Sequence, residues 1–326
     1  MHAPDGFLNA ATALSTGVVS AGAISVALRQ TRDRLRDAQV PLAGLAAAFV
    51  FAAQMFNFPV AAGTTGHLLG GALAAVLLGP WTGLIVVSVV VVVQALLFAD
   101  GGLTALGYNV LNMAVVTSLG GWGVFRLARR VLPVTVGGIS LAAGVAAFAS
   151  VVLSSAAFSL EWLFGATLPV PFDRVFLAMV GVHVLIGIGE AVITTLTISA
   201  VLRSRPDLVT GADGLQTGTR ERVDRRAFAL GGLAVTFVVA AAVSQFAVDA
   251  PDGLERVAED TGIAAAAEDH ALGSSLFADY AVRGVGNQNV SLAVAGVAGS
   301  LLTLAVGGGL VAATRGRRRD TLALRR

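Results

Sequence analysis

The first two residues, Met1 and His2, carry three nitrogen atoms joined by short covalent tethers. The α-amine of Met1 and the amide nitrogen of His2 close a five-membered chelate ring around a metal ion. The same amide and the imidazole of His2 close a six-membered ring. With the amide deprotonated, the three nitrogens lie nearly in one plane. This arrangement suits Ni(II), Cu(II) or low-spin Co(II), whereas Zn(II) prefers a tetrahedron and Mg(II) prefers oxygen ligands.

The planar set leaves one position open, and a second histidine can fill it. His67 is the best candidate because it lies in the Gly/Thr-rich stretch NFPVAAGTTGHLLGG, residues 57–71, where glycines let the backbone come close. His183 lies inside an expected helix near Glu190, and His270 lies in a polar loop. We therefore predict a metal site built from Met1, His2 and His67.

The donors need a chain that folds back on itself. Pro4-Asp5-Gly6 predicts a tight turn, because proline presets φ, aspartate caps and glycine accepts a positive φ. A helix is expected directly after it, so the first three residues turn towards the rest of the molecule. A signal-peptide interpretation fails, because no basic residue precedes the apolar run.

The composition predicts a membrane protein. The chain of 326 residues is 56% hydrophobic and only 13% charged, and its mean hydropathy is +0.80. Apolar runs of about 20 residues indicate membrane-spanning helices. We expect an all-α, polytopic helical bundle with a seven-helix core and a two-helix C-terminal module. The expected helices are 7–28, 40–57, 66–80, 82–99, 107–128, 135–160, 173–203, 227–248 and 288–314.

The basic residues predict the orientation. Lysine is absent, and with the N-terminus outside all but three of the 22 arginines fall on the inner side. Basic residues concentrate on the cytoplasmic side of membranes, so we expect a prokaryotic cell-membrane protein with its N-terminus outside and its C-terminus in the cytoplasm. The cytoplasmic arginines can also contact lipid headgroups. Without lysine, the phosphate-binding loop of ATPases cannot be built, and without cysteine neither disulfides nor thiolate sites are possible.

The charge pattern divides the chain into three parts. Residues 1–203 form the expected seven-helix domain, residues 204–226 a polar cytoplasmic linker, and residues 227–326 a module of two membrane helices with a basic tail. An outer loop, 249–287, separates those two helices and is rich in acidic residues. The acids fit either the attraction of cations or an ordinary charge bias across the membrane.

Three segments carry a resemblance to a known family. MHAPDGFL, FNFPVAAGTTGHLLGGALAAVLLGPW and ALGYNVLNM resemble the CbiM/NikM family, the substrate-binding membrane component of energy-coupling-factor nickel/cobalt transporters. PDGLERVAED with FADYAV resembles the PDGLE module that is often fused to it. The resemblance implies a seven-helix bundle in which the amine of Met1, the amide and imidazole of His2, and His67 hold the metal in a square plane. It also implies a transmembrane coupling protein and cytoplasmic ATPase subunits as partners.

Polar residues near the expected outer half are candidates to orient the imidazoles, since a ligating histidine usually donates its other N–H to an acceptor. Ordinary hydrogen bonding between helices is an equally good interpretation. These candidates are Gln54, Asn57, Thr65, Asn109 and Asn112.

The predicted function is therefore capture of Ni²⁺ or Co²⁺ for an ATP-driven importer. The ion is the substrate, and neither a catalytic residue, a resident cofactor nor a nucleic-acid partner is expected. Neither an HExxH zinc-protease motif nor a Gly-x-Ser-x-Gly elbow occurs. A metal transporter driven by an ion gradient, using Glu190 and Asp173, and a metal sensor without transport are the alternatives.

Metal binding is expected to weaken at low pH. Binding displaces protons from the amine and amide nitrogens, so proton uptake opposes it and helps release. Titration of the metal at a series of pH values measures this effect, and an affinity independent of pH would contradict the amide ligand.

Overall fold

The computed structural model describes residues 1–34, 39–61, 63–216 and 223–323. Its core is an all-helical bundle with one small antiparallel hairpin, β1 (Phe58–Ala61) with β2 (Thr64–Gly66). The first helices are α1 (Ala10–Arg34), α2 (Gln39–Gln54), α3 (Gly71–Leu78) and α4 (Pro80–Val93), which continues as a π-helical turn over Gln94–Phe98. The others are α5 (Leu106–Val110), a π-helical segment over Leu111–Gly120, α6 (Gly121–Ala128), α7 (Val136–Gly165) and α8 (Phe172–Ser204).

The C-terminal part adds three helices: α9 (Arg225–Ala241), α10 (Gly253–Thr261) and α11 (Gln288–Ala323). Helix α11 packs closely on α2 at facing glycines. A Cβ placed on Gly44 would lie 2.8 Å from the carbonyl oxygen of Leu304 and 3.3 Å from the Cα of Gly308. Small residues of this kind allow membrane helices to approach closely, so the two parts of the chain share one packed interface.

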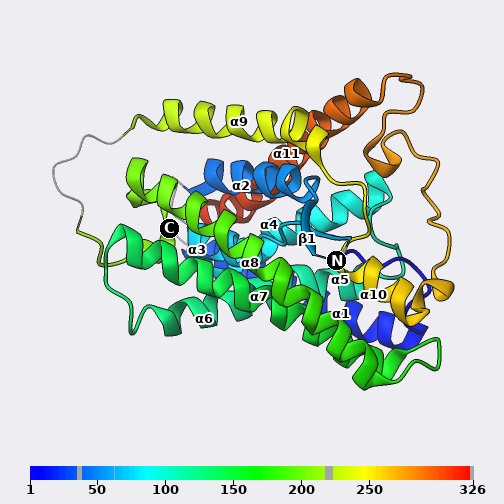
Figure 1. Cartoon of the computed structure of the whole chain (residues 1–326). Coiled ribbons are helices and arrows are strands. Elements are labelled where there is room, and N and C mark those ends of the chain that lie inside the picture. The colour runs from blue at the N-terminus through cyan, green and yellow to red at the C-terminus, as the bar shows by residue number, and fades with distance from the viewer. Residues whose placement is uncertain (35–38, 62, 217–222, 324–326) are drawn as a thin grey trace.

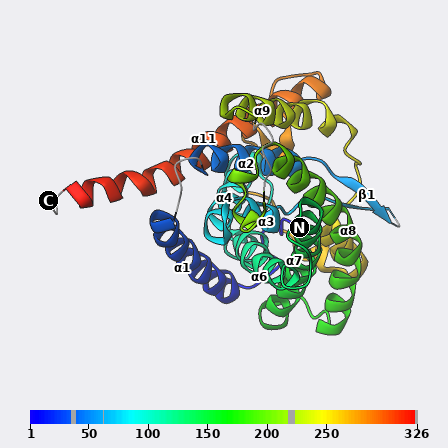
Figure 2. The same ribbon diagram turned by 90° about the vertical axis from the view of Figure 1, so that its left-hand side faces the viewer.

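Helix α4 forms the centre of the bundle. Its sequence PWTGLIVVSVVVVV is apolar on every side, as in helices that are buried all round, and nearly all of its residues are buried. The view along the bundle shows α3 and α4 enclosed by the other helices, with α1 on the periphery (Figure 2). Because α1 keeps most of its apolar surface exposed, that surface is suited to lipid or to a membrane partner.

The predicted fold class is confirmed. Within the described residues, seven helical segments are long and apolar enough to cross a membrane. Two expected helices are shorter than predicted: 40–57 ends at Gln54, and 66–80 is reduced to Gly71–Leu78. The hairpin and the left-handed Gly70, with φ of 80°, occupy the residues in between. The expected linker lies partly outside the described residues.

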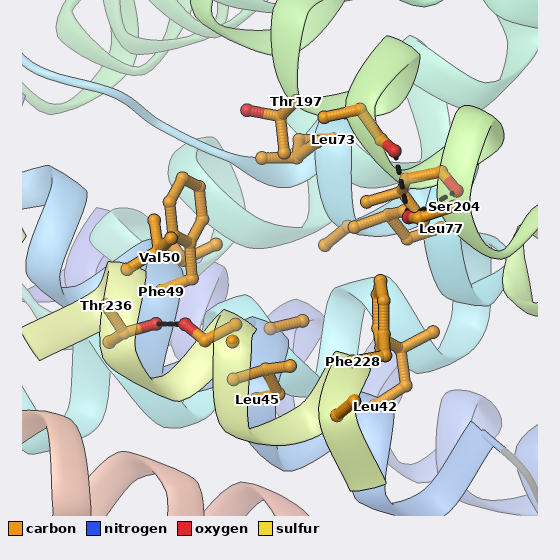
Figure 3. A pocket seen from close by; sticks show the side chains of 18 residues that line it. Leu42, Leu45, Phe49, Val50, Leu73, Leu77, Thr197, Ser204, Phe228 and Thr236 are labelled. Carbon is orange, nitrogen blue, oxygen red and sulfur yellow. Dashed lines mark hydrogen bonds between the residues drawn. The ribbon is translucent and has the colours of Figure 1, made fainter. Parts of the chain in front are cut away.

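The two ends of the bundle differ. The N-terminus, α10 and the segment that follows α10 gather at one end, whereas the C-terminal end of α8 and the start of α9 lie at the other (Figure 1). Near these helix ends, a cavity of about 350 Å³ lies among α2, α3, α8 and α9. Figure 3 shows its apolar side chains, such as Phe49, Leu77 and Phe228. The hydroxyls of Ser204 and Thr236 there bond to carbonyls of their own helices, so this cavity has no set of metal donors.

Candidate metal centre

The N-terminal segment is fixed in place by Asp5. Its carboxylate accepts hydrogen bonds from the backbone nitrogens of Leu103, Thr104 and Ala105 at 3.1, 2.6 and 3.3 Å. It also accepts a hydrogen bond from the Thr104 hydroxyl. Gly6, with φ of 90°, completes the turn, and a Cβ there would strike the carbonyl oxygen of Ala266 at 2.1 Å. The turn predicted at Pro4-Asp5-Gly6 therefore folds the chain back onto the bundle.

Asn109 and Tyr108 hold the same segment from α5. The side-chain amide of Asn109 pairs with the backbone of Ala3 in both directions, each bond being 2.9 Å long. The Tyr108 hydroxyl donates to the carbonyl of Pro4 at 3.1 Å. Ser154 donates a hydrogen bond to the Met1 sulfur at 3.2 Å. The side chain of Met1 is therefore held inside the bundle, where it is buried.

His67 presents an unprotonated nitrogen to the N-terminus. Its Nδ1 lies 3.1 Å from the carbonyl oxygen of Leu68, which can only accept, so Nδ1 carries the proton. The lone pair is therefore on Nε2, which lies 2.5 Å from the Met1 amine. Neutral imidazole with a free nitrogen is the form that binds metals.

The loop carrying His67 is anchored by a buried carboxylate. Glu190 of α8 accepts the backbone N–H groups of Leu69 and Gly70 at 2.6 and 2.8 Å. Gln54 donates to the carbonyl of Leu69 at 3.0 Å. These hydrogen bonds give partners to backbone groups that lie just before α3 and have none within a helix or strand. Buried backbone groups need such partners.

His2 lies beside His67. The two rings are stacked with centroids 5.2 Å apart and an interplanar angle of 22°. His2 Nε2 lies 3.0 Å from Oε1 of Gln94, whose amide nitrogen donates to the Tyr280 hydroxyl at 3.0 Å. Tyr280 in turn donates to Asp100. This chain of bonds directs Nε2–H towards Gln94 and so assigns the lone pair to Nδ1, the nitrogen that closes a six-membered ring with the His2 amide.

The charges favour a neutral imidazole at His2. Burial lowers the pKa of His2 to about 4, although the carboxylate of Asp100, 3.3 Å from Nδ1, acts in the opposite direction. Because His2 is neutral at neutral pH, its ring needs no deprotonation before it can act as a donor.

Asp252 brings a carboxylate from the C-terminal part. Its Oδ2 contacts the Met1 amine and lies 3.4 Å from Nε2 of His67. Burial by itself raises the pKa of Asp252, but the N-terminal ammonium beside it holds that pKa well below its ordinary value. An ionised carboxylate therefore faces the amine at the centre of the site.

A polar cavity of about 810 Å³ opens onto the site. The predicted acidic loop contributes to it, together with Asp100 and His270. Its acidic lining residues are Asp5, Asp100, Asp249, Asp252, Glu255, Glu259, Glu268 and Asp279. A cleft lined by charges of one sign concentrates ions of the opposite sign, so the cavity is suited to attract cations towards the centre.

The predicted residues fall into two groups. Met1, His2 and His67 come together, as the chelate argument expects. Among the contacts of the described residues, the five candidate orienting residues bond elsewhere than to an imidazole. Asn109 holds Ala3, Asn112 donates to Glu161 at 2.7 Å, and Gln54 and Thr65 bond to backbone carbonyls, while Asn57 lines the polar cavity.

His183 and Glu190, which are neighbours in the expected helix, bind different partners. His183 Nδ1 bonds to the carbonyl of Met179 at 2.7 Å, and Glu190 holds the His67 loop. His183 nevertheless lies at the edge of the site, because it lines a small cavity together with Met1, His67 and Asp252.

Sequence reasoning missed Gln94, Asp100, Asp252 and Tyr280. Only Asp252 left a local signal: Pro251-Asp252-Gly253 repeats the Pro-Asp-Gly of the N-terminus, and Asp252 with Glu255 forms a capping box for α10. Within the described residues, no three His, Asp or Glu side chains are grouped as a metal site, and the centre combines two imidazoles with a backbone terminus.

The helices define a multi-pass membrane protein with a nitrogen-lined centre at one end of its bundle. The chain belongs to the family described as the cobalt uptake substrate-specific transmembrane region, which matches residues 2–208. Residues 226–316 match the PDGLE domain.

Two relatives and one solved structure illustrate the similarity. A putative fused nickel transport protein NikMN of Archaeoglobus fulgidus is 32% identical over 311 residues, covering 94% of this chain and 97% of that protein. A putative metal transport protein of Haloquadratum walsbyi is 41% identical, covering 64% of this chain and 93% of that protein. The crystal structure of a truncated transition metal transporter is 31% identical, with a TM-score of 0.55 over 62% of this chain and 99% of that one.

Replacing Asp5 should release the N-terminal segment. Asp5→Ala removes the acceptor of three backbone N–H groups, and hydrogen bonds to charged groups contribute about 1.5–3 kcal/mol each. We expect faster amide hydrogen exchange at Ala3 and at Leu103–Ala105, read by mass spectrometry. Asp269→Ala, at an exposed position of the acidic loop, is the control, and equal exchange in both variants would contradict this anchoring role.

Proposed function

We propose that this chain captures Ni²⁺ or Co²⁺ at the outer face of the membrane, as the substrate-binding component of an energy-coupling-factor importer. The observation that carries the proposal is the convergence of donors: the Met1 amine lies 2.5 Å from His67 Nε2, with the His2 ring stacked alongside. The name of the archaeal relative, a fused nickel transport protein, supports this substrate class.

The donors fit a planar nitrogen site. The Met1 amine, the His2 amide, His2 Nδ1 and His67 Nε2 supply four nitrogens, and the hydrogen bonds at Gln94 and Leu68 leave both imidazole lone pairs free. Such a field suits Ni(II) and low-spin Co(II). To bind the ion, the amine gives up its proton and its contact with Asp252, and the amide loses its proton to complete the plane.

Partners supply the energy in this proposal. The chain has no lysine and so no phosphate-binding loop of the Gly-Lys-Ser/Thr type. ATP hydrolysis is therefore assigned to cytoplasmic ATPase subunits, which act through a transmembrane coupling protein. The arginine distribution supports an orientation with the metal centre outside and the C-terminal end of α8 in the cytoplasm.

Three glycines added before Met1 should abolish uptake. The extension keeps every side chain but converts the Met1 amine to an amide and moves the free amine several residues away, so that it can no longer chelate one ion together with the amide and imidazole of His2. We expect uptake of labelled Ni²⁺ and Co²⁺, measured in competition in cells that express the partner subunits, to fall to background for this variant and for His67→Ala.

Asp269→Ala is the control, because this residue is exposed in the acidic loop, and its uptake should equal that of the wild type. Uptake that survives the extension would contradict the proposed amine ligand. Depleting ATP at a clamped membrane potential separates the two modes of energisation, because uptake that continues would indicate a gradient-driven transporter.

A further inference from the structure

Asp252 is held in one orientation at the metal centre by contacts on both sides. Its Oδ1 accepts the N–H groups of Leu254 and Glu255 at 2.8 and 2.9 Å, capping α10. Its Oδ2 points away from that helix to the Met1 amine. One carboxylate thus joins the first turn of α10 to the other end of the sequence.

The chain around Asp252 is seated tightly on the core. Thr65 of β2, two residues before His67, donates from its backbone to Pro251 at 3.0 Å and from its hydroxyl to Ala250 at 2.9 Å. A Cβ on Gly253 would lie 2.5 Å from the Ile186 side chain and 3.0 Å from His183. A larger residue there would have to displace the Ile186 side chain, so α10 is packed closely on α8 directly after Asp252.

The carboxylate of Asp252 balances the charge of the site. In the empty site, the Met1 ammonium carries one positive charge and Asp252 one negative charge. In the loaded site of the proposed function, a divalent ion and one deprotonated amide leave one positive charge among the nitrogens. Burying an uncompensated charge is costly, and the removal of one partner of a buried pair destabilises strongly. The carboxylate of Asp252 compensates the charge in both states.

We propose that Asp252 is the counter-ion of the metal centre, so that the fused C-terminal module completes the binding site. This inference rests on the proposed function. Asp100 does not take this role, because its side chain is more exposed, at 27% against 11% for the side chain of Asp252. The Asp100 carboxylate also accepts a hydrogen bond from the Tyr280 hydroxyl. Asp252 sets the affinity of the site through its charge while the nitrogens remain the ligands.

The test is metal titration of the full-length protein in detergent, with NiCl₂ and CoCl₂ as probes. Asp252→Asn removes the charge but keeps a good helix N-cap, and Asp269→Asn is the matched loop control. Partners of metal ligands typically contribute 10–100-fold in affinity, so we expect Asp252→Asn to bind Ni²⁺ about 10–100-fold more weakly. The visible absorption band of the bound Ni²⁺ should stay unchanged, because the nitrogen set is intact.

Each outcome is decisive. Affinity within about twofold of the wild type overturns the counter-ion role, and a shifted absorption band overturns it in favour of direct ligation. If Asp252→Asn does not fold, Asp252→Ser takes its place: serine also caps a helix but carries no charge, and the same two results decide the role of Asp252. Binding by the wild type that is lost in His67→Ala upholds the proposed function independently of Asp252, whereas a wild type that binds neither ion overturns both.

Discussion

The contact between the Met1 amine and Nε2 of His67 requires a buried chain terminus, and the end of the bundle that holds this contact is organised around that requirement. A terminus normally frays because few contacts order it. Here Met1 is only 5% exposed, and Asp5, Asn109 and Tyr108 secure the residues behind it. On the opposite side, Glu190 fixes the loop that brings His67 to the amine. The donors are thus held by contacts within the bundle before any ion arrives.

The C-terminal module completes the enclosure of this terminus. The segment after α10 pairs with the N-terminal turn through a bridge between Asp5 and Glu268, and Tyr280 extends the hydrogen-bond chain that begins at His2. Helices α9 and α11 pack on α2, so the module is bound to the core both along the bundle and at the end where Met1 lies. The residues around the candidate centre therefore come from both matched domains.

The predictable part of the site was the part fixed by covalent geometry. The nitrogens of Met1 and His2 are a few bonds apart, and the glycines beside His67 indicate close backbone approach, so all three could be found in the sequence. Asp252 is 251 residues from Met1, and no periodicity records such a contact. Gln94 looked like part of an apolar helix, but it begins a π-helical turn that ends at the left-handed Ala99. The long helix expected at 66–80 failed for a similar reason, because a side chain from α8 holds the backbone at Leu69 and Gly70.

The burial of the Met1 amine also limits how this end of the chain can be modified. An acyl group on this nitrogen would remove its basic lone pair and compete for the space beside His67 and Asp252. A fusion partner placed before Met1 would disturb the same contacts. The opposite terminus imposes no such condition, since α11 leads away from the bundle, and an affinity tag belongs at that end.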